Sequence, residues 1–410
     1  MGRFLKCPLP FHSNKPQISD QSQIHLHSDS SSNSSLSSQS SLPSVPSLTP
    51  PIEQPTTVAA AHHHCLATLK GHSSYISSLA LAGKHLYCGD ADGKIAVWDR
   101  NPSSPQNHTV AEGYSAVKSI AVSGDKIFTA HQDHKIRVWK IDNSTANKKY
   151  KMVTVLPTLS DRCVRLLSAK NYVKVRRHKK CTWVHHVDAV SALALTRDGS
   201  LLYSVSWDRS FKVWRTSDFK CLESVQNAHD DAINAVVLSN DGFVYTGSAD
   251  KKIKVWKKID GEKKHSLVST LEKHKSAVNA LALSSDGSVL YSGACDRSII
   301  VWEKDGGAAH MAVAGALRGH TKAILCLAVV SDLLCSGSAD KTVRVWRRGC
   351  GNSYSCLAVF EGHRNPVKCL TTSLDSNHAK SATETGDSYL VYSGSLDSEI
   401  KVWKIWVPFA

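Results

Sequence analysis

The sequence predicts an all-β fold built from seven repeated units, and three observations lead to this prediction. The dipeptide Val-Trp occurs seven times, with spacings of 41, 75, 42, 46, 44 and 57 residues between successive tryptophans. An aspartate stands six residues before each tryptophan, and the residues between them alternate as in a half-buried strand, for example "KKIKVW". Upstream of most units, a His-x-x-x-Val/Ile pattern opens a further strand, as in "EKHKSAVNALAL". Such a period is typical of a ring-shaped repeat protein.

These features recur in register and resemble the WD-repeat family from about residue 62 to residue 404. The resemblance implies a seven-bladed β-propeller. It also implies a hydrogen-bonded group of four side chains in each blade, formed by the histidine, a Ser or Thr, the turn aspartate and the tryptophan. Five units carry the full set: His186, Ser204, Asp208 and Trp214; His229, Thr246, Asp250 and Trp256; His274, Ser292, Asp296 and Trp302; His320, Ser336, Asp340 and Trp346; His363, Ser393, Asp397 and Trp403.

The first two units depart from this pattern. Unit one pairs Asp92 with Trp98 but has Cys88 at the hydroxyl position, and unit two has Gly113 where the histidine would stand. We therefore expect an incomplete network in unit two. A catalytic triad occurs once, in a pocket, whereas these residues repeat at a fixed period. The pattern indicates a structural role and no enzymatic activity.

The ring must also close. The stretch "HCLATLKGH" (64–72) matches the outer strand that precedes each histidine, but no earlier unit is available to pair with it. We expect it to form the fourth strand of the last blade, since closure removes exposed strand edges. The propeller then occupies residues 62–407.

Residues 1–61 are rich in Ser and Pro and too poor in apolar residues to offset the entropy of ordering. We predict a disordered tail there, and we expect deletion of residues 1–55 to leave the fold intact. A second irregularity, about 373–388 in the last blade, reads as a polar surface loop.

The largest irregularity is an insert at about 160–185, between the second and third blades. Its first part reads as a short helix capped by Ser160 or Asp161, and its second part as a hairpin or an extended arm. From residue 159 to 185 there are eight basic residues and one acidic residue, 8 − 1 = +7, out of +15 for the chain. The basic cluster and its flanking aromatics are partner-binding candidates: Tyr172, Lys174, Arg176, Arg177, Lys179, Lys180 and Trp183.

Four interpretations of this cluster stay open: a nuclear-import signal, a nucleic-acid surface, an interface for acidic proteins, and a structured insert whose basic residues are solvated or neutralise a neighbouring acidic surface. Further candidates stand beside the His and Asp positions at the loop ends: Lys118, Gln132, Asp188, Trp207, Asp231, Lys322 and Asn365. Trp207 stands out because Ala occupies the matching position in several other units.

The insert, within seven repeats and behind a Ser-rich tail, resembles the plant JINGUBANG-like WD-repeat proteins. That resemblance implies a non-enzymatic regulator in cytoplasm and nucleus that binds proteins, TCP-class transcription factors among them, in transcription regulation that restrains pollen germination. The alternatives are a nucleic-acid or anionic-lipid binder acting through the insert, and a ubiquitin-ligase substrate receptor.

Other features add no chemistry. The twelve cysteines lack any C-x-x-C pair and read as reduced thiols, and "HHHC" (62–65) lacks the spacing of a metal site. We expect no cofactor and no metal. No apolar run is long enough to span a membrane, and we expect a monomeric propeller.

Overall fold

A computed structural model describes residues 45–49, 61–100, 107–142, 149–166, 172–176, 179–259, 261–262, 264–304, 310–349, 353–375 and 386–409. The chain divides into two units, Met1–Ser44 and Val45–Ala410, and the description below concerns the second.

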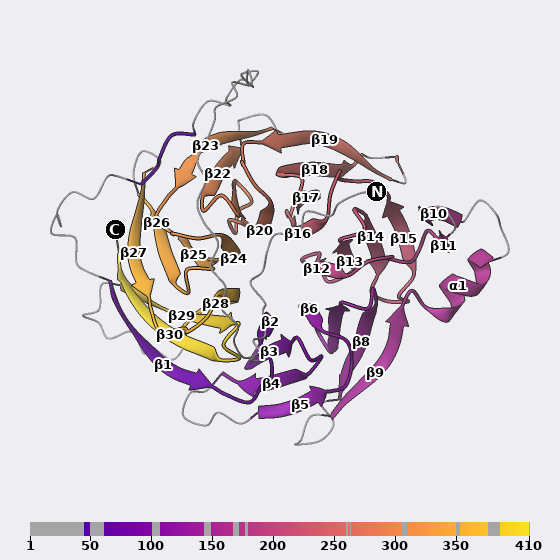
Figure 1. The fold of residues 1–410 in the computed structure, drawn as a ribbon, viewed down its shortest axis with the longest axis horizontal. Coiled ribbons are helices and arrows are strands. Elements are labelled where there is room, and N and C mark those ends of the chain that lie inside the picture. Colours follow the sequence, from indigo (N-terminus) through magenta and orange to yellow (C-terminus); the bar gives the residue numbers. More distant parts are fainter. Residues whose placement is uncertain are drawn as a thin grey trace, which may run out of the picture. The chain divides into compact units, whose positions relative to one another are not determined.

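Seven four-stranded antiparallel sheets form a ring among the described residues (Figure 1), which confirms the predicted seven-bladed β-propeller. From the ring axis outward, blade 1 consists of β2 (Ile76–Ala82), β3 (His85–Asp90), β4 (Ile95–Asp99) and β5 (Asn107–Ala111). Blade 2 consists of β6 (Val117–Ser123), β7 (Lys126–His131), β8 (Ile136–Asp142) and β9 (Lys149–Leu156). Blade 3 consists of β12 (Val190–Leu195), β13 (Leu201–Ser206), β14 (Phe211–Arg215) and β15 (Cys221–Val225).

The remaining blades follow the same order. Blade 4 consists of β16 (Ile233–Leu238), β17 (Phe243–Ser248), β18 (Lys252–Lys258) and β19 (His265–Glu272). Blade 5 consists of β20 (Val278–Leu283), β21 (Val289–Ala294), β22 (Ile299–Lys304) and β23 (Met311–Leu317). Blade 6 consists of β24 (Ile324–Val330), β25 (Leu333–Ser338), β26 (Val343–Arg348) and β27 (Tyr354–Phe360). Blade 7 consists of β28 (Val367–Leu374), β29 (Gly386–Ser395), β30 (Ile400–Pro408) and β1 (His62–Leu69).

The blades pack face to face through buried aliphatic side chains, and each innermost strand lies beside those of its two neighbours. Several blades carry a glycine in the second strand because the next blade approaches closely there. A Cβ on Gly293 would lie 2.5 Å from Cγ2 of Ile324, and one on Gly394 would lie 2.6 Å from Cγ2 of Ile76. Steric exclusion at these contacts therefore sets the spacing between blades.

The strand β1 closes the ring as predicted. It pairs antiparallel with β30, from His62 opposite Trp406 to Leu69 opposite Ile400, and so completes blade 7 with the N-terminal end of the propeller. Leu69 is buried in the cluster between blades 7 and 1. The pairing covers the main-chain edge of β30 that would otherwise face solvent.

The structure changes the bounds of two expected segments, the tail 1–61 and the loop 373–388. The expected tail 1–61 is interrupted by residues 45–49, which form main-chain hydrogen bonds with β23, because the edge of that strand offers unpaired amide and carbonyl groups. The rest of the expected tail, 1–44 and 50–60, lies outside the described residues. The expected loop 373–388 is shorter, since β28 continues to Leu374 and β29 starts at Gly386, with 376–385 outside the described residues.

The insert contains both expected elements. The helix α1 (Leu159–Leu166) is capped by Thr158, whose hydroxyl accepts the amide of Asp161 at 3.1 Å, so the expectation of Ser160 or Asp161 as cap was wrong. The second part is a two-stranded hairpin of β10 (Tyr172–Arg176) and β11 (Lys179–Thr182). Figure 1 shows α1 and the hairpin outside the ring, beside β15.

Deletion of residues 62–69 tests the closure. We expect loss of the cooperative thermal transition and aggregation, because the edge of β30 and the pocket of Leu69 become exposed. Deletion of residues 2–43 is the control, and it should leave the transition unchanged. Thermal unfolding with size-exclusion chromatography measures both; an unaltered melting temperature after removal of 62–69 would contradict the role of β1.

Candidate protein-interaction face

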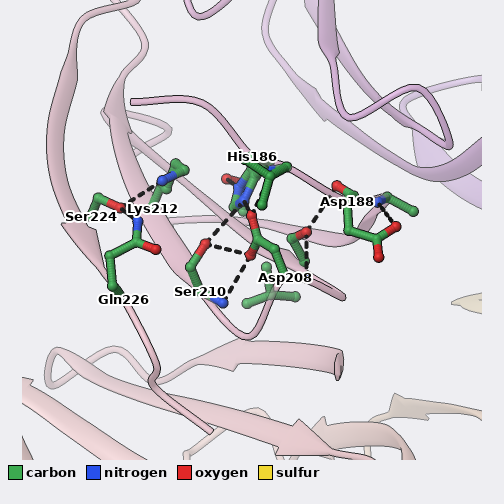
Figure 2. A network of polar contacts seen from close by, with 12 residues as sticks. His186, Asp188, Asp208, Ser210, Lys212, Ser224 and Gln226 are labelled. Carbon is green, nitrogen blue, oxygen red and sulfur yellow. Dashed lines mark hydrogen bonds and ion pairs between the residues drawn. The ribbon is translucent and has the colours of Figure 1, made fainter. Parts of the chain in front are cut away.

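Blade 3 shows how four side chains form one buried hydrogen-bonded chain. Figure 2 shows His186 next to Asp208. Its Nδ1 lies 3.1 Å from Asp208 Oδ2, and its Nε2 lies 2.8 Å from Ser204 Oγ. Trp214 Nε1 donates to the same hydroxyl at 2.9 Å. A carboxylate only accepts, so Nδ1 of His186 carries the proton of the bond to Asp208. Burial lowers the pKa of His186, which favours the neutral imidazole with Nε2 accepting from Ser204.

The same chain of bonds, here called the tetrad, forms in four further blades. In each, the imidazole bonds the aspartate at 2.8–2.9 Å and the hydroxyl at 2.8 Å. The tryptophan reaches the hydroxyl at 2.8–2.9 Å. These tetrads are the four remaining sets predicted from the sequence: His229, Thr246, Asp250 and Trp256; His274, Ser292, Asp296 and Trp302; His320, Ser336, Asp340 and Trp346; His363, Ser393, Asp397 and Trp403.

The inner members of the tetrads are closed to any partner. All five hydroxyl residues are fully buried, namely Ser204, Thr246, Ser292, Ser336 and Ser393. The five indoles are also buried, namely Trp214, Trp256, Trp302, Trp346 and Trp403. These side chains therefore belong to the blade interiors as structural residues, and a ligand on the surface of the ring meets none of them.

The tetrad aspartate holds two loops together. In blade 4, Asp250 Oδ2 accepts the amide of Asp230 at 3.0 Å and Oδ1 accepts the amide of Lys252 at 2.9 Å. The first amide belongs to the loop before the innermost strand, and the second belongs to the turn between the second and third strands. The carboxylate therefore ties the loop to the turn while it binds His229.

All seven blades add a main-chain bond between these two segments. The amides of Ala91, Gln132, Trp207, Ala249, Cys295, Ala339 and Leu396 donate to the carbonyls of Tyr75, Ala116, Ala189, Ala232, Ala277, Ala323 and Pro366. Because the strand order repeats from blade to blade, these bonded segments share one face of the ring, here called the loop face. Its backbone is held rigidly, which favours selective binding.

Blade 2 lacks a complete tetrad, as predicted, but its buried hydroxyl still bonds to an imidazole. His131, at the end of β7, takes the place that Gly113 leaves vacant, with Nε2 2.8 Å from Thr129 Oγ1 and Nδ1 2.7 Å from the Ser115 carbonyl. Trp139 donates to Thr129 at 3.0 Å. The same buried space is filled by an imidazole from another strand position, so Asp133 instead forms an ion pair with Arg137 at 2.6 Å.

Blade 1 differs from the prediction. His72 Nδ1 bonds Asp90 at 2.8 Å, not the expected Asp92, and Nε2 lies 2.8 Å from Cys88 Sγ. Asp90 is fully buried, whereas Asp92 is exposed and accepts only the hydroxyl of Ser73 among its described side-chain contacts. The carboxylate has moved two residues along the chain, to the position that His131 occupies in blade 2.

Burial controls the protonation of these groups. Burial lowers the pKa of His131 to about 4, a shift that the bond to the Ser115 carbonyl opposes and nearby Arg137 reinforces. Burial alone raises the pKa of Asp397, but the hydrogen bond and charge of His363 and two amides lower it to about 2. The folded protein thus holds a neutral imidazole at His131 and an ionised carboxylate at Asp397 at neutral pH.

Trp207 and Lys118 make the most distinctive contact on the loop face. Trp207 is 37% exposed, and Lys118 Nζ, from β6, lies 5.3 Å from the centroid of its ring. Burial and, to a smaller extent, the charge of Lys368 on β28 together lower the pKa of Lys118 to about 8. An exposed indole beside closely placed cations is suited to an acidic partner.

The register of these lysines makes them unusual. At the same position of the innermost strand, four blades carry a residue that donates to the next blade's carbonyl: Ser77 to Val117, Ser191 to Ile233, Asn234 to Val278 and Asn279 to Ile324. Blades 2 and 7 have Lys118 and Lys368 there instead. Lys368 was not among the residues predicted from the sequence, although it stands at the same position of its repeat as Lys118.

The remaining loop-face candidates differ in accessibility. Lys322 and Asn365 are exposed, while Gln132, Asp188 and Asp231 are half-buried. The carboxylates of Asp188 and Asp231 each accept a neighbouring amide at 2.7 Å, so part of their bonding capacity serves the loop. These residues lie on the same face as Trp207.

The insert is anchored to blade 3 by buried polar groups. Asp161, which is buried at the start of α1, accepts the amide of Cys221 on β15 at 3.1 Å. Lys212, fully buried on β14, donates to the carbonyl of Trp183 and to Ser224 Oγ, both at 2.6 Å (Figure 2). Neither anchor was anticipated, because a lysine in an alternating strand is normally read as exposed.

The basic candidates lie in the chain between these two anchors. Tyr172, Lys174 and Arg176 lie on β10, and Lys179 and Lys180 lie on β11. Arg177 lies outside the described residues. Trp183 is half-buried and packs against the buried cluster of blades 2 and 3, so only part of its indole is open to a partner.

Other reactive groups are scarce among the residues that the structure describes. No three His, Cys, Asp or Glu side chains gather there as metal ligands, and no described helix could cross a membrane. Burial raises the pKa of the Cys88, Cys326 and Cys335 thiols to about 12, which makes them poor nucleophiles.

Comparisons with known proteins agree with the repeats. The family model described as WD domain, G-beta repeat matches residues 63–99, 178–215, 219–257, 265–303, 312–347 and 354–404. The unmatched stretch between 99 and 178 holds blade 2, in which the histidine has moved to position 131.

Several curated proteins are similar over part of their length. Protein Notchless of Drosophila melanogaster is 29% identical over 315 residues, which cover 76% of this chain and 57% of that protein. Striatin-4 of Mus musculus is 27% identical over 248 residues, covering 55% and 26%. Autophagy-related protein 16 of Arabidopsis thaliana is 24% identical over 209 residues, covering 50% and 39%. The chain thus spans less than two thirds of each of these relatives.

The substitution Asp250→Ala tests the tetrad carboxylate. We expect a loss of roughly 2–4 kcal/mol in unfolding free energy, because a buried imidazole and two amides lose their acceptor. Asp90→Ala should cost a similar amount in blade 1. Asp92→Ala, at the position that matches Asp250 but exposed, is the control and should cost less than about 1 kcal/mol. Denaturant melts measure all three; equal losses for Asp90 and Asp92 would contradict the reassignment.

The pH dependence of stability tests the buried imidazoles. Since the pKa of His131 is lowered from an unfolded value of about 6.5 to about 4, the unfolded chain binds more protons between these values. Stability should therefore be full above pH ~6.5 and fall as the pH drops towards ~4. His131→Gln should reduce this slope, and His108→Gln, an exposed histidine, should not. Melts at several pH values decide, and an unchanged slope in His131→Gln would be inconsistent with the lowered pKa.

Proposed function

The chain belongs to the WD-repeat family, and we propose that it acts as a non-enzymatic scaffold that binds other proteins on its loop face. WD-repeat proteins generally act as protein-interaction scaffolds. One observation carries the proposal here. Trp207 is partly exposed, its ring contacts the Lys118 ammonium group, and its amide is hydrogen-bonded to the carbonyl of Ala189. An aromatic anchor on a rigid frame is typical of an interaction hot spot.

The chemistry of the site favours an acidic partner. A carboxylate near Lys118 and Lys368 would stabilise the charged form of Lys118, whose pKa is lowered by burial and by the charge of Lys368. The described Ser, His and Asp groups that recur in the blades are bonded to one another inside the tetrads, which supports a structural rather than a catalytic role for them.

The finer proposal concerns the pathway. The basic insert and the Ser-rich leader support a plant regulator of the JINGUBANG-like type that binds TCP-class transcription factors, regulates transcription and restrains pollen germination. Its proposed location is cytoplasm and nucleus, with the hairpin β10–β11 serving nuclear import or partner binding. The propeller is proposed to act as a monomer.

A second candidate is binding of nucleic acid or anionic lipid through the insert 160–185. The concentration of basic residues on a hairpin favours it. Such binding weakens steeply with salt, with a log-log slope of roughly one per phosphate contact. A salt-insensitive association would instead support a protein partner.

Quantitative affinity capture tests the two surfaces separately. In Trp207→Ala we expect partner affinity to fall about 10-fold or more, since an anchoring aromatic is lost, with little change in melting temperature. A purified TCP-class factor, titrated by calorimetry, tests the finer proposal. Retained affinity in Trp207→Ala would contradict the loop face as the binding surface.

The insert is tested by neutralising Arg176, Arg177, Lys179 and Lys180 to Gln. The control carries the same charge change at four exposed lysines elsewhere, Lys84, Lys220, Lys264 and Lys275. Loss of nuclear signal with unchanged partners in the first variant alone would indicate an import signal, and loss of partners would indicate an interface. Equal behaviour of the two variants would remove any specific role for the hairpin.

A further inference from the structure

Residues Val45–Thr49, here called the latch, lie along the outer edge of blade 5. Ser47 forms a parallel bridge with Ala316 of β23. The amide of Ala316 donates to the Pro46 carbonyl, and the amide of Leu48 donates to the Ala316 carbonyl, both at 2.9 Å. Pro46 has no amide hydrogen, and it takes part in this pairing through its carbonyl alone. The latch is thus added to the edge of blade 5 in the manner of a bound peptide strand.

The latch also crosses to blade 6. The amide of Tyr354, the first residue of β27, donates to the Leu48 carbonyl at 3.0 Å. Arg318 adds a bond from Nη2 to the Val45 carbonyl at 2.9 Å. Three of the five residues, Val45, Pro46 and Leu48, therefore bond to the edges of blades 5 and 6 through their backbone, so that the surface recognises an extended conformation.

A socket for one aliphatic side chain lies between these strands. Leu48 packs against the buried cluster that includes Tyr291 and Tyr354, whose hydroxyls lie 3.1 Å apart. The socket exists because position 315 is glycine: a Cβ there would lie 2.4 Å from Cγ of Leu48. The three heavy atoms nearest to that Cβ all belong to Leu48.

The socket is particular to blade 5. Gly315 pairs with Val301, the residue before the blade tryptophan. The residues at the matching register of the other blades are His108, Thr154, Glu223, Ser269, Ala358 and Ala67, and each carries a Cβ. Among the described residues, the bridge to Ala316 is accordingly the one strand contact of this kind.

We propose that the surface formed by the outer strands of blades 5 and 6 is a binding site for an extended, uncharged peptide with one partly buried leucine, and that Val45–Thr49 occupies it as an intramolecular latch. The Ser47 side chain is exposed, and its hydrogen bonds among the described residues go to Thr49. The binding contacts come from a few backbone groups and Leu48, and they are opposed by the entropy of ordering five residues. The latch is therefore displaceable, and its tether gives it an advantage over free peptides.

The test uses the full chain and three variants. Leu48→Asp places a charge in the socket and should release the latch. Ser47→Asp introduces the same residue at the exposed neighbouring position and should leave the latch bound. Gly315→Val places its Cβ against Leu48, which supplies the three heavy atoms nearest to that position, so it should release the latch while the propeller stays folded.

Hydrogen exchange reads the latch directly. In Leu48→Asp and Gly315→Val, the amides of Ala316 and Tyr354 lose their acceptors and should exchange about 10-fold faster or more, while those of other blades stay unchanged. Ser47→Asp should match the wild-type chain. Unchanged exchange at both amides in Leu48→Asp would overturn the latch, and so would faster exchange spread over all blades.

Binding in trans reads the site. A fluorescent peptide of residues 43–51, followed by anisotropy, should bind the Leu48→Asp protein at least ~10-fold more tightly than the wild-type chain, whose site is occupied. Two controls follow. A peptide 43–51 with Asp in place of its leucine should not bind the Leu48→Asp protein. The unaltered peptide should not bind a protein that carries both Leu48→Asp and Gly315→Val. Equal binding to wild-type and Leu48→Asp proteins, or none to either, would overturn the proposal.

Discussion

A buried carboxylate that accepts from an imidazole and from two loop amides is the interaction on which the loop face of this propeller depends. In blade 4 it is Asp250, which binds His229, the amide of Asp230 and that of Lys252. Burial raises the pKa of this carboxyl group, but the donors outweigh burial and lower the pKa overall. The carboxylate therefore stays ionised. The imidazole in turn carries the bond inward to the Thr246 hydroxyl and the Trp256 indole. One charge thus fixes a loop, a turn and the middle of a blade together.

Blades 1 and 2 show that the geometry of this network matters more than the sequence position of its members. His131 reaches the hydroxyl of Thr129 from the end of β7, and Asp90 reaches His72 from the corresponding residue of β3. Both side chains start from the same strand position and fill the space that the tetrad fills elsewhere. Buried polar groups require partners, and in blade 2 His131 and Trp139 both bond to the Thr129 hydroxyl.

Specificity is added to this regular frame at three places. The insert is fixed to blade 3 by Asp161 and by the buried Lys212, so the charged hairpin is presented by an anchored element. Lys118 and Lys368 replace residues that in four other blades bond to the neighbouring blade, and Lys118 places its ammonium group over Trp207. Gly315 opens a socket that Leu48 fills. Each is a local departure that the ring tolerates because its closure and spacing depend on other contacts.

The sequence by itself determined the number of blades, the closing strand and the members of five tetrads, because these follow from periodic patterns and from local bonding rules. Position 207 was also recognisable, since one aromatic breaks a repeated small residue. Only the tertiary structure decided that Asp90 replaces Asp92, that Trp183 packs inward, that Lys212 is buried, and that residues 45–49 leave the tail for the edge of blade 5. These outcomes depend on which groups meet across blades that are distant in sequence. No periodic pattern encodes such meetings, because burial and hydrogen-bond partners there are set by the packing of the closed ring.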